Sequence, residues 1–115
     1  MDEPVWQAFD VARLVEKCEA RGARYLEFLR VPQLSCGIYA LDAGATDTQS
    51  THDEDEIYFV LKGRAQLIVD GEETELRQGS VVYVPADVEH AFSNIEEDLS
   101  ILVFFGSGGP SGAQD

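Results

Sequence analysis

The chain has 115 residues, and its 22 acidic side chains against 8 basic ones give a formal net charge of −14. A field of this sign repels phosphate backbones and anionic lipid, so nucleic acids and membrane surfaces are poor candidates for partners. The length suits one domain, and an apolar fraction of 44% is ordinary for a folded protein with a hydrophobic core.

Residues 1–23 are expected to form an arm and one short helix ahead of the main domain. Apolar residues recur at helical spacing in the segment from Asp10 to Arg21, at Val11, Leu14, Val15 and Cys18. Asp10 is suited to cap the first turn, and Gly22 to end the helix in a left-handed conformation. The first residues lack the features of a signal peptide, and no apolar stretch reaches the length of a membrane span.

Residues 24–106 have the pattern of a domain of short strands. We expect strands at Arg24–Val31, Ser35–Leu41, Ile57–Leu61, Ala65–Val69, Thr74–Leu76, Val81–Val84, Ala91–Ser93 and Leu99–Phe105. Asp70-Gly71 is typical of a two-residue hairpin, and Lys62-Gly63 and Gln78-Gly79 are expected to be turns. The regular spacing predicts an all-β sandwich or jelly-roll barrel, and the glycine-rich residues 107–115 are expected to form a flexible tail.

The two cysteines, Cys18 and Cys36, are too few to indicate a disulfide framework. Free, buried thiols in a reducing compartment are the simpler interpretation. Together with the lack of signal-peptide features, this predicts a cytoplasmic protein.

The residues best suited to chemistry are the two histidines of the chain, His52 and His90, and the nearby Glu56. Each histidine lies near a predicted strand boundary, where side chains can line the mouth of a barrel. Two imidazoles and a carboxylate are a common ligand set for a divalent transition metal. Alternatively, both histidines lie on the surface and the acidic run Asp53–Glu56 is a solvated turn.

The spacing of these residues resembles two sequence motifs of the cupin superfamily. The first motif, G-x(5)-H-x-H-x(3,4)-E-x(6)-G, is matched at four of five fixed positions, by Gly44, His52, Glu56 and Gly63. The second motif, G-x(5)-P-x-G-x(2)-H-x(3)-N, is matched at four of five, by Gly79, Pro85, His90 and Asn94. The resemblance covers about residues 35–105 and implies the cupin double-stranded β-helix, a jelly-roll barrel with one short N-terminal helix.

The resemblance implies that His52, Glu56 and His90 ligate a divalent transition metal inside the barrel, without distinguishing Fe, Mn, Ni and Zn. Ser50 stands where the family usually has its first histidine. A hydroxyl is a much weaker ligand than an imidazole, so either water fills that position or metal binding is lost. Asp47 and Gln49 are weaker candidates to replace the missing histidine as a ligand. Asp87 replaces a glycine of the second motif, and Asp tolerates a left-handed backbone better than most residues.

Several aromatic residues are candidates for lining the barrel: Tyr39, Tyr58, Tyr83, Phe92 and Phe104. Plain core packing is an equally good interpretation for each of them. A substrate pocket is predicted to contain Ser50, Tyr39, Tyr58, Phe92 and Asn94. No residue is a dedicated general base, although Tyr58 or Tyr83 would serve if it faced the metal.

Two kinds of function are compatible with these features. The first is a metal-dependent enzyme of the dioxygenase, isomerase or lyase type, acting on a small organic molecule. The second is a non-catalytic binding or sensor protein, because the departure at Ser50 is one route to lost activity. The resemblance also implies a homodimer, for which Trp6 and Phe9 would supply an apolar anchor.

Overall fold

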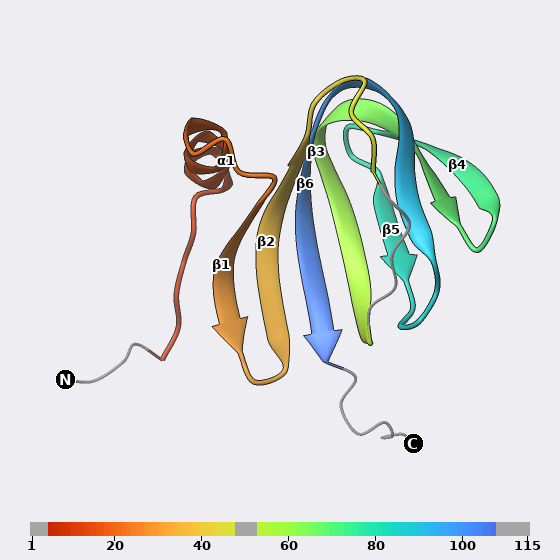
Figure 1. The fold of residues 1–115 in the computed structure, drawn as a ribbon. Coiled ribbons are helices and arrows are strands. Elements are labelled where there is room, and N and C mark those ends of the chain that lie inside the picture. Colours follow the sequence, from red (N-terminus) through yellow and green to blue (C-terminus); the bar gives the residue numbers. More distant parts are fainter. Residues whose placement is uncertain (1–4, 48–52, 108–115) are drawn as a thin grey trace.

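A computed structural model describes residues 5–47 and 53–107, in which one helix precedes six strands (Figure 1). The elements in chain order are α1 (Val11–Ala20), β1 (Tyr25–Val31), β2 (Leu34–Leu41), β3 (Glu54–Val69), β4 (Glu72–Arg77), β5 (Val81–Val84) and β6 (His90–Ser107). Within the described residues, no helix has the length and apolar character needed to cross a membrane.

The strands form one antiparallel sheet in the order β1-β2-β6-β3-β4, with β5 paired to β3. β3 and β6 are the longest strands, with 16 and 18 residues, and they pair with each other from end to end. Both arch across the top of the molecule in Figure 1, so the two ends of each strand belong to different sides of the fold. This is the predicted all-β barrel with one short N-terminal helix.

Local geometry follows the sequence where the signal lies within a few residues. The Asp10 carboxylate accepts a hydrogen bond from the backbone N–H of Arg13 at 3.3 Å, which confirms the N-cap. Gly22 follows the helix with a φ of 62°. Asp70 and Gly71 have φ values of 52° and 83°, and positive values at both positions are what a type I′ hairpin turn requires.

The predicted turn at Lys62-Gly63 is wrong, because β3 continues through it. The pairing of β3 with β6 changes register on both sides of Lys62, as a β-bulge does. Gly63 has a φ of 100°, and a Cβ at this position would clash with the backbone of Asp98 and Leu99. The glycine therefore bends a long strand instead of ending it.

The separate strands predicted at Ala91–Ser93 and Leu99–Phe105 are also one strand, β6. Asn94 lies between them with a φ of 48°, a left-handed conformation that Asn adopts more readily than most residues. The described part of the chain therefore has six strands, where the sequence pattern predicted eight.

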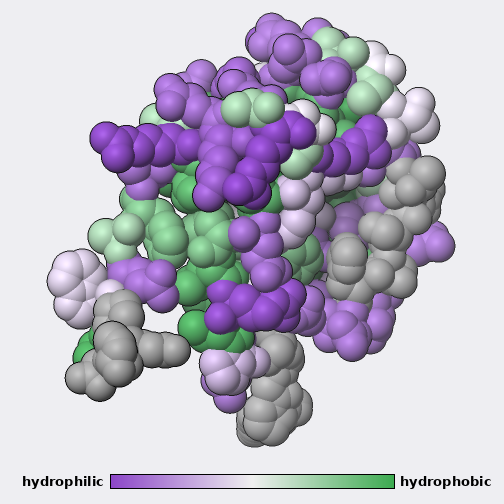
Figure 2. Space-filling model, turned by 60° about the vertical axis from the view of Figure 1, so that its left-hand side comes forward, coloured by the Kyte–Doolittle hydropathy of each residue, from purple (hydrophilic) through white to green (hydrophobic). Residues whose placement is uncertain are grey.

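Alternation of side chains along the strands produces two hydrophobic clusters on opposite faces of the sheet. The cluster inside the barrel consists of Leu41, Tyr58, Val60, Ala65, Leu67, Leu76, Val84, Phe92, Ile95, Leu99, Ile101 and Val103. The outer cluster lies between the sheet and α1, with Cys18, Leu26 and Ile38 at its centre. Figure 2 shows hydrophilic side chains over the helix and hydrophobic ones gathered on the sheet below it. Both cysteines are buried and free, as expected.

Candidate functional site

Glu56 and His90 face each other inside the barrel. Their side chains are 1% and 4% exposed, and Oε2 of Glu56 lies 3.5 Å from Nε2 of His90. In the sheet, however, Glu56 pairs with Phe105 and His90 pairs with Val69, at opposite ends of β3. The curvature of the two long strands, and not strand pairing, therefore brings the two side chains together.

The loop before β6 fixes the orientation of the His90 ring. Nδ1 of His90 lies 2.9 Å from the carbonyl oxygen of Val88. A carbonyl can only accept a hydrogen bond, so this contact requires the proton to be on Nδ1. In the neutral ring Nε2 then presents its lone pair toward Glu56. Metal-binding histidines are typically held in this way, with the other ring nitrogen donating to a carbonyl or carboxylate.

The chemistry of this pair fits a cation. A carboxylate at the depth of Glu56 is costly unless a hydrogen-bond donor or a positive charge compensates it. The Tyr58 hydroxyl supplies one hydrogen bond to Glu56. When the ring is neutral, the facing atoms of Glu56 and His90 are both acceptors, and a proton or a metal ion between them would turn repulsion into attraction. The donor set therefore suits the divalent metal that the sequence resemblance implies.

Tyr58 packs against His90 and Phe92 on the inner face of the sheet. Its ring centroid lies 6.0 Å from that of His90 and 5.2 Å from that of Phe92. Burial raises the pKa of Tyr58, and the hydrogen bond to Glu56 raises it further. A phenol held in its neutral form donates hydrogen bonds and is a poor general base. Tyr58 is therefore better suited to donate a hydrogen bond than to serve as a general base.

Asp47 connects two residues of the predicted pocket. The Tyr39 hydroxyl donates to Oδ1 of Asp47 at 2.8 Å, and the backbone N–H of Phe92 donates to Oδ2 at 2.9 Å. Burial, followed by the hydrogen bond to Asp47, raises the pKa of Tyr39. The rings of Tyr39 and Phe92 lie 5.8 Å apart. Tyr39, Tyr58 and Phe92 therefore form one continuous aromatic wall beside His90.

Asp55 anchors the loop that presents His90, a role that the sequence pattern did not indicate. Its Oδ1 accepts a hydrogen bond from the backbone N–H of Ala86 at 2.9 Å. Asp87, in the same loop, has a φ of 67°, the left-handed conformation expected at a glycine position of the motif. The sequence feature that could have indicated this role was the acidic run at 53–56, but composition alone suggested that this run was a solvated turn.

Other predicted residues do not join this group. Tyr83 is 60% exposed and pairs in register with Ile57, on the outer face of the sheet, so it does not meet the condition under which it would serve as a base. Phe104 also pairs with Ile57 and faces outward. Asn94 is exposed at the bend of β6.

Two predicted residues, Ser50 and His52, lie outside the described part of the chain. Within residues 5–47 and 53–107, no three His, Cys, Asp or Glu side chains form a group able to hold a metal. The structure thus brings together two residues of the predicted ligand set, Glu56 and His90, and the third position rests on the motif alone.

Comparisons with known proteins show the family of the chain. A model of the cupin domain matches residues 37–105, a segment that contains both Glu56 and His90. SCO3923, an uncharacterised protein of Streptomyces coelicolor, is 50% identical over 99 residues, which are 86% of this chain and 94% of that protein.

Solved structures share the fold at lower identity. A cupin protein from Bacteroides fragilis is 22% identical, with a TM-score of 0.71 over 98% of this chain and 93% of its own. The DMSP lyase DddQ from Ruegeria pomeroyi is 25% identical, with a TM-score of 0.62 over 71% of this chain and 41% of the lyase. The barrel, the matched domain model and the Streptomyces relative lead to one conclusion: this chain belongs to the cupin family.

Proposed function

We propose that the barrel binds a divalent transition metal through His52, Glu56 and His90, and that the protein is a metal-dependent enzyme acting on a small organic molecule. The observation that carries this proposal is the buried Glu56–His90 pair, with 3.5 Å between Oε2 and Nε2. Two ionisable side chains inside an apolar barrel are far more typical of a functional site than of a core. His52 enters the proposal from its motif position.

A bound metal would supply Lewis-acid chemistry or access to dioxygen. The residues of the chain would bind and orient the substrate. The neutral Tyr58 hydroxyl is a fixed hydrogen-bond donor next to His90, and the rings of Tyr39 and Phe92 form an apolar wall that limits the access of water. Dioxygenase, isomerase and lyase reactions all use such a site, and DddQ is a lyase by name.

Metal content is the first test of this proposal. Untagged protein, purified without chelator, would be measured by elemental mass spectrometry alongside His52→Ala, Glu56→Gln and His90→Gln. We expect a stoichiometric metal in the wild type and its loss in each variant, because each substitution removes a ligand. Glu96→Gln is the matched control, since Glu96 is an exposed carboxylate on β6. Absence of metal after incubation with iron, manganese, nickel and zinc would contradict the proposal of a metal-dependent enzyme.

A second measurement separates an enzyme from a sensor. Oxygen consumption or product formation that requires the metal would support catalysis. Thermal stabilisation of the metal-free protein by a small organic ligand would favour the non-catalytic alternative, because ligand binding to the folded state alone raises the melting temperature.

We also propose that two copies of the chain pair through the outer face of β3 and β5. Ile57, Val81 and Tyr83 are 42%, 64% and 60% exposed, and strand register places all three on this face. Two copies with a net charge of −14 repel each other where charged surfaces meet, so an uncharged patch is the surface on which they can approach. Two-fold pairing requires only that such a patch fit itself.

Light scattering at micromolar concentration tests the pairing. We expect a dimer for the wild type and a monomer for Tyr83→Glu, which would bury a charge in the interface. Glu72→Gln, on exposed β4, should leave the dimer intact. A monomeric wild type would reject the proposal.

A further inference from the structure

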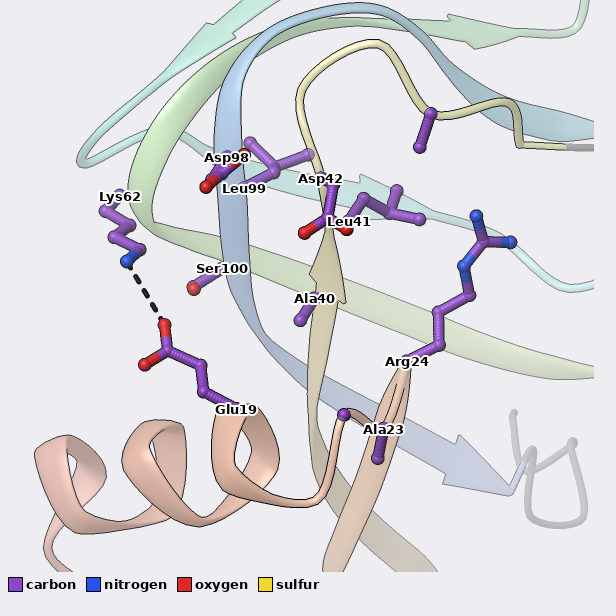
Figure 3. Close-up of a pocket in the computed structure, with 12 residues that line it drawn as sticks. Glu19, Ala23, Arg24, Ala40, Leu41, Asp42, Lys62, Asp98, Leu99 and Ser100 are labelled. Atoms are coloured by element: carbon purple, nitrogen blue, oxygen red, sulfur yellow. Dashed lines mark hydrogen bonds and ion pairs between the residues drawn. The ribbon is translucent and has the colours of Figure 1, made fainter.

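A pocket of about 460 Å³ lies outside the barrel, between the C-terminal end of α1 and the outer face of the sheet (Figure 3). Part of its lining is a row of residues paired across β2, β6 and β3, namely Ala40, Ser100 and Lys62. The adjacent outward pair, Ile38 and Leu102, is large and packs beneath α1. The space past the helix end stays open because Ala40 and Ser100 are too small to fill it.

The Ser100 hydroxyl is the feature that points to a ligand. Ser100 is 2% exposed and lines the pocket, and Figure 3 shows its oxygen directed into the space beside Glu19 and Lys62. The described residues 5–47 and 53–107 provide no hydrogen-bond partner for this side chain. The hydroxyl borders the open space of the pocket, so it is available to a molecule bound there.

The two cationic side chains of the pocket are already engaged. Nζ of Lys62 lies 3.2 Å from Oε2 of Glu19, an ion pair that connects β3 to the end of α1. The guanidinium of Arg24 donates to the carbonyl oxygen of Thr46 at 3.1 Å. Figure 3 shows these two cations on opposite sides of the pocket, with Asp42 and Asp98 between them.

The remaining charges of the pocket are negative. Asp42 is exposed, and Oδ1 of Asp98 accepts a hydrogen bond from the backbone N–H of Ala43 at 2.8 Å. The C-terminal end of α1, which borders the pocket, carries the negative end of the helix dipole. The net charge of −14 adds a general attraction for cations.

We propose that this pocket binds a small organic cation, a primary ammonium group on a short alkyl chain. Asp42 and Asp98 attract the ammonium group, and the Ser100 hydroxyl accepts a hydrogen bond from it. Ala23 and Ala40, which line the pocket on the outer face, contact the alkyl chain. The volume lies within the range of small-molecule sites, roughly 300 to 1,000 Å³. This site is independent of Glu56 and His90, which lie on the inner face of the sheet.

A titration of the full chain, labelled with ¹⁵N, with 1,4-diaminobutane at constant ionic strength tests the proposal. We expect saturable shifts of the backbone amide signals of Asp42, Ala43 and Ser100, with a dissociation constant on the order of 1 mM. Succinate, of similar length but opposite charge, should produce no such shifts. Butanol should bind more weakly than butylamine, because it lacks the ammonium group.

Variants locate the site. Asp42→Asn should weaken binding about tenfold, in line with the loss of one charge-assisted hydrogen bond. Ser100→Ala keeps the volume and should weaken binding roughly threefold, as expected for a neutral hydrogen bond. Ala40→Leu should fill the hollow and abolish binding. Glu75→Gln, an exposed carboxylate on β4, is the matched control and should bind as the wild type does.

The proposal would be overturned by shifts that never saturate, by shifts spread over the acidic surface, or by equal affinities of Asp42→Asn and Glu75→Gln. The first two outcomes would mean unspecific attraction to a negative protein. If Glu56→Gln loses the metal but binds the diamine unchanged, the metal site and the outer pocket bind their ligands independently.

Discussion

The inner and outer faces of β3 and β6 share one backbone, but they are closed in different ways. On the inner face the curvature of the strands closes the barrel and brings Glu56 to within 3.5 Å of His90. On the outer face a separate element, α1, covers Ile38 and ends short of Ser100, which leaves an open pocket. One face is enclosed by the sheet itself and the other by a short helix.

This difference bears on where each kind of site can form. Inner side chains are held by strands that are hydrogen-bonded along their length, so they can keep a carboxylate and an imidazole at a set distance. Outer side chains contact a helix of ten residues, which can shift as a unit when its contacts change. We therefore expect a substitution on the inner face to lower the free energy of unfolding more than a similar one on the outer face, where the helix can move to fill the space.

The largest expected effect compares two isoleucines that are both 0% exposed, Ile101 inside the barrel and Ile38 under α1. Ile101→Ala should lower the free energy of unfolding by about 4 kcal/mol and Ile38→Ala by about 2 kcal/mol, because a helix can settle into the cavity more easily than a barrel can contract. Urea denaturation measures both values. Equal losses would contradict the comparison.

The next effect concerns the bend of β3. Gly63→Ala should lower the free energy of unfolding by about 2 kcal/mol or more, because a Cβ there meets the backbone of Asp98 in addition to the unfavourable φ. Gly71→Ala is the matched control. It has a similar positive φ but open space around the added atom, so its cost should be about half as large. A similar cost for both would mean that the close approach of the strands is unimportant.

A smaller effect should be confined to the outer element. Asp10→Ala removes the N-cap of α1 and should cost about 1 kcal/mol. Hydrogen exchange should then speed up in α1 while protection in β3 and β6 stays unchanged. Asp10→Asn keeps an oxygen that caps the helix and should behave like the wild type. Faster exchange throughout the barrel would show that the helix and the barrel unfold as one unit.

The smallest effect lies at the edge strand β1, where Tyr25 packs over Gly37 on the inner side. Burial, and then the nearby Glu27 carboxylate, raises the pKa of Tyr25 to about 12. The neutral phenol is favoured in the folded state, so its stabilisation is complete below the usual value of about 10 and is lost as the pH rises through about 12.

Tyr25→Phe should therefore make the free energy of unfolding fall less steeply between these two pH values. Tyr25 is 37% exposed, so solvent screening keeps the difference small. Urea denaturation at several pH values in this range measures it. Identical slopes for the wild type and Tyr25→Phe would contradict a raised pKa of Tyr25 in the folded protein.

Much of the fold was predictable because its signals are local. The cap at Asp10, the left-handed Gly22 and the Asp70-Gly71 turn each depend on residues a few positions away. The continuity of β3 through Gly63 was not predictable, because a glycine that bends a strand has the same local pattern as one that ends it. Of the candidate site, motif spacing indicated Glu56 and His90, whereas the anchoring roles of Asp47 and Asp55 depend on contacts with distant residues.

The sequence by itself predicted the helix and an all-β domain, because hydrophobic periodicity and turn residues are properties of neighbours along the chain. The resemblance to the two motifs implied the cupin barrel and the candidate metal positions. Only the tertiary structure decided that Tyr58 faces His90 while Tyr83 faces outward, and that a pocket opens beyond α1. The register of paired strands and the arch of β3 and β6 decide which face each residue occupies, and both depend on contacts between residues far apart in the chain.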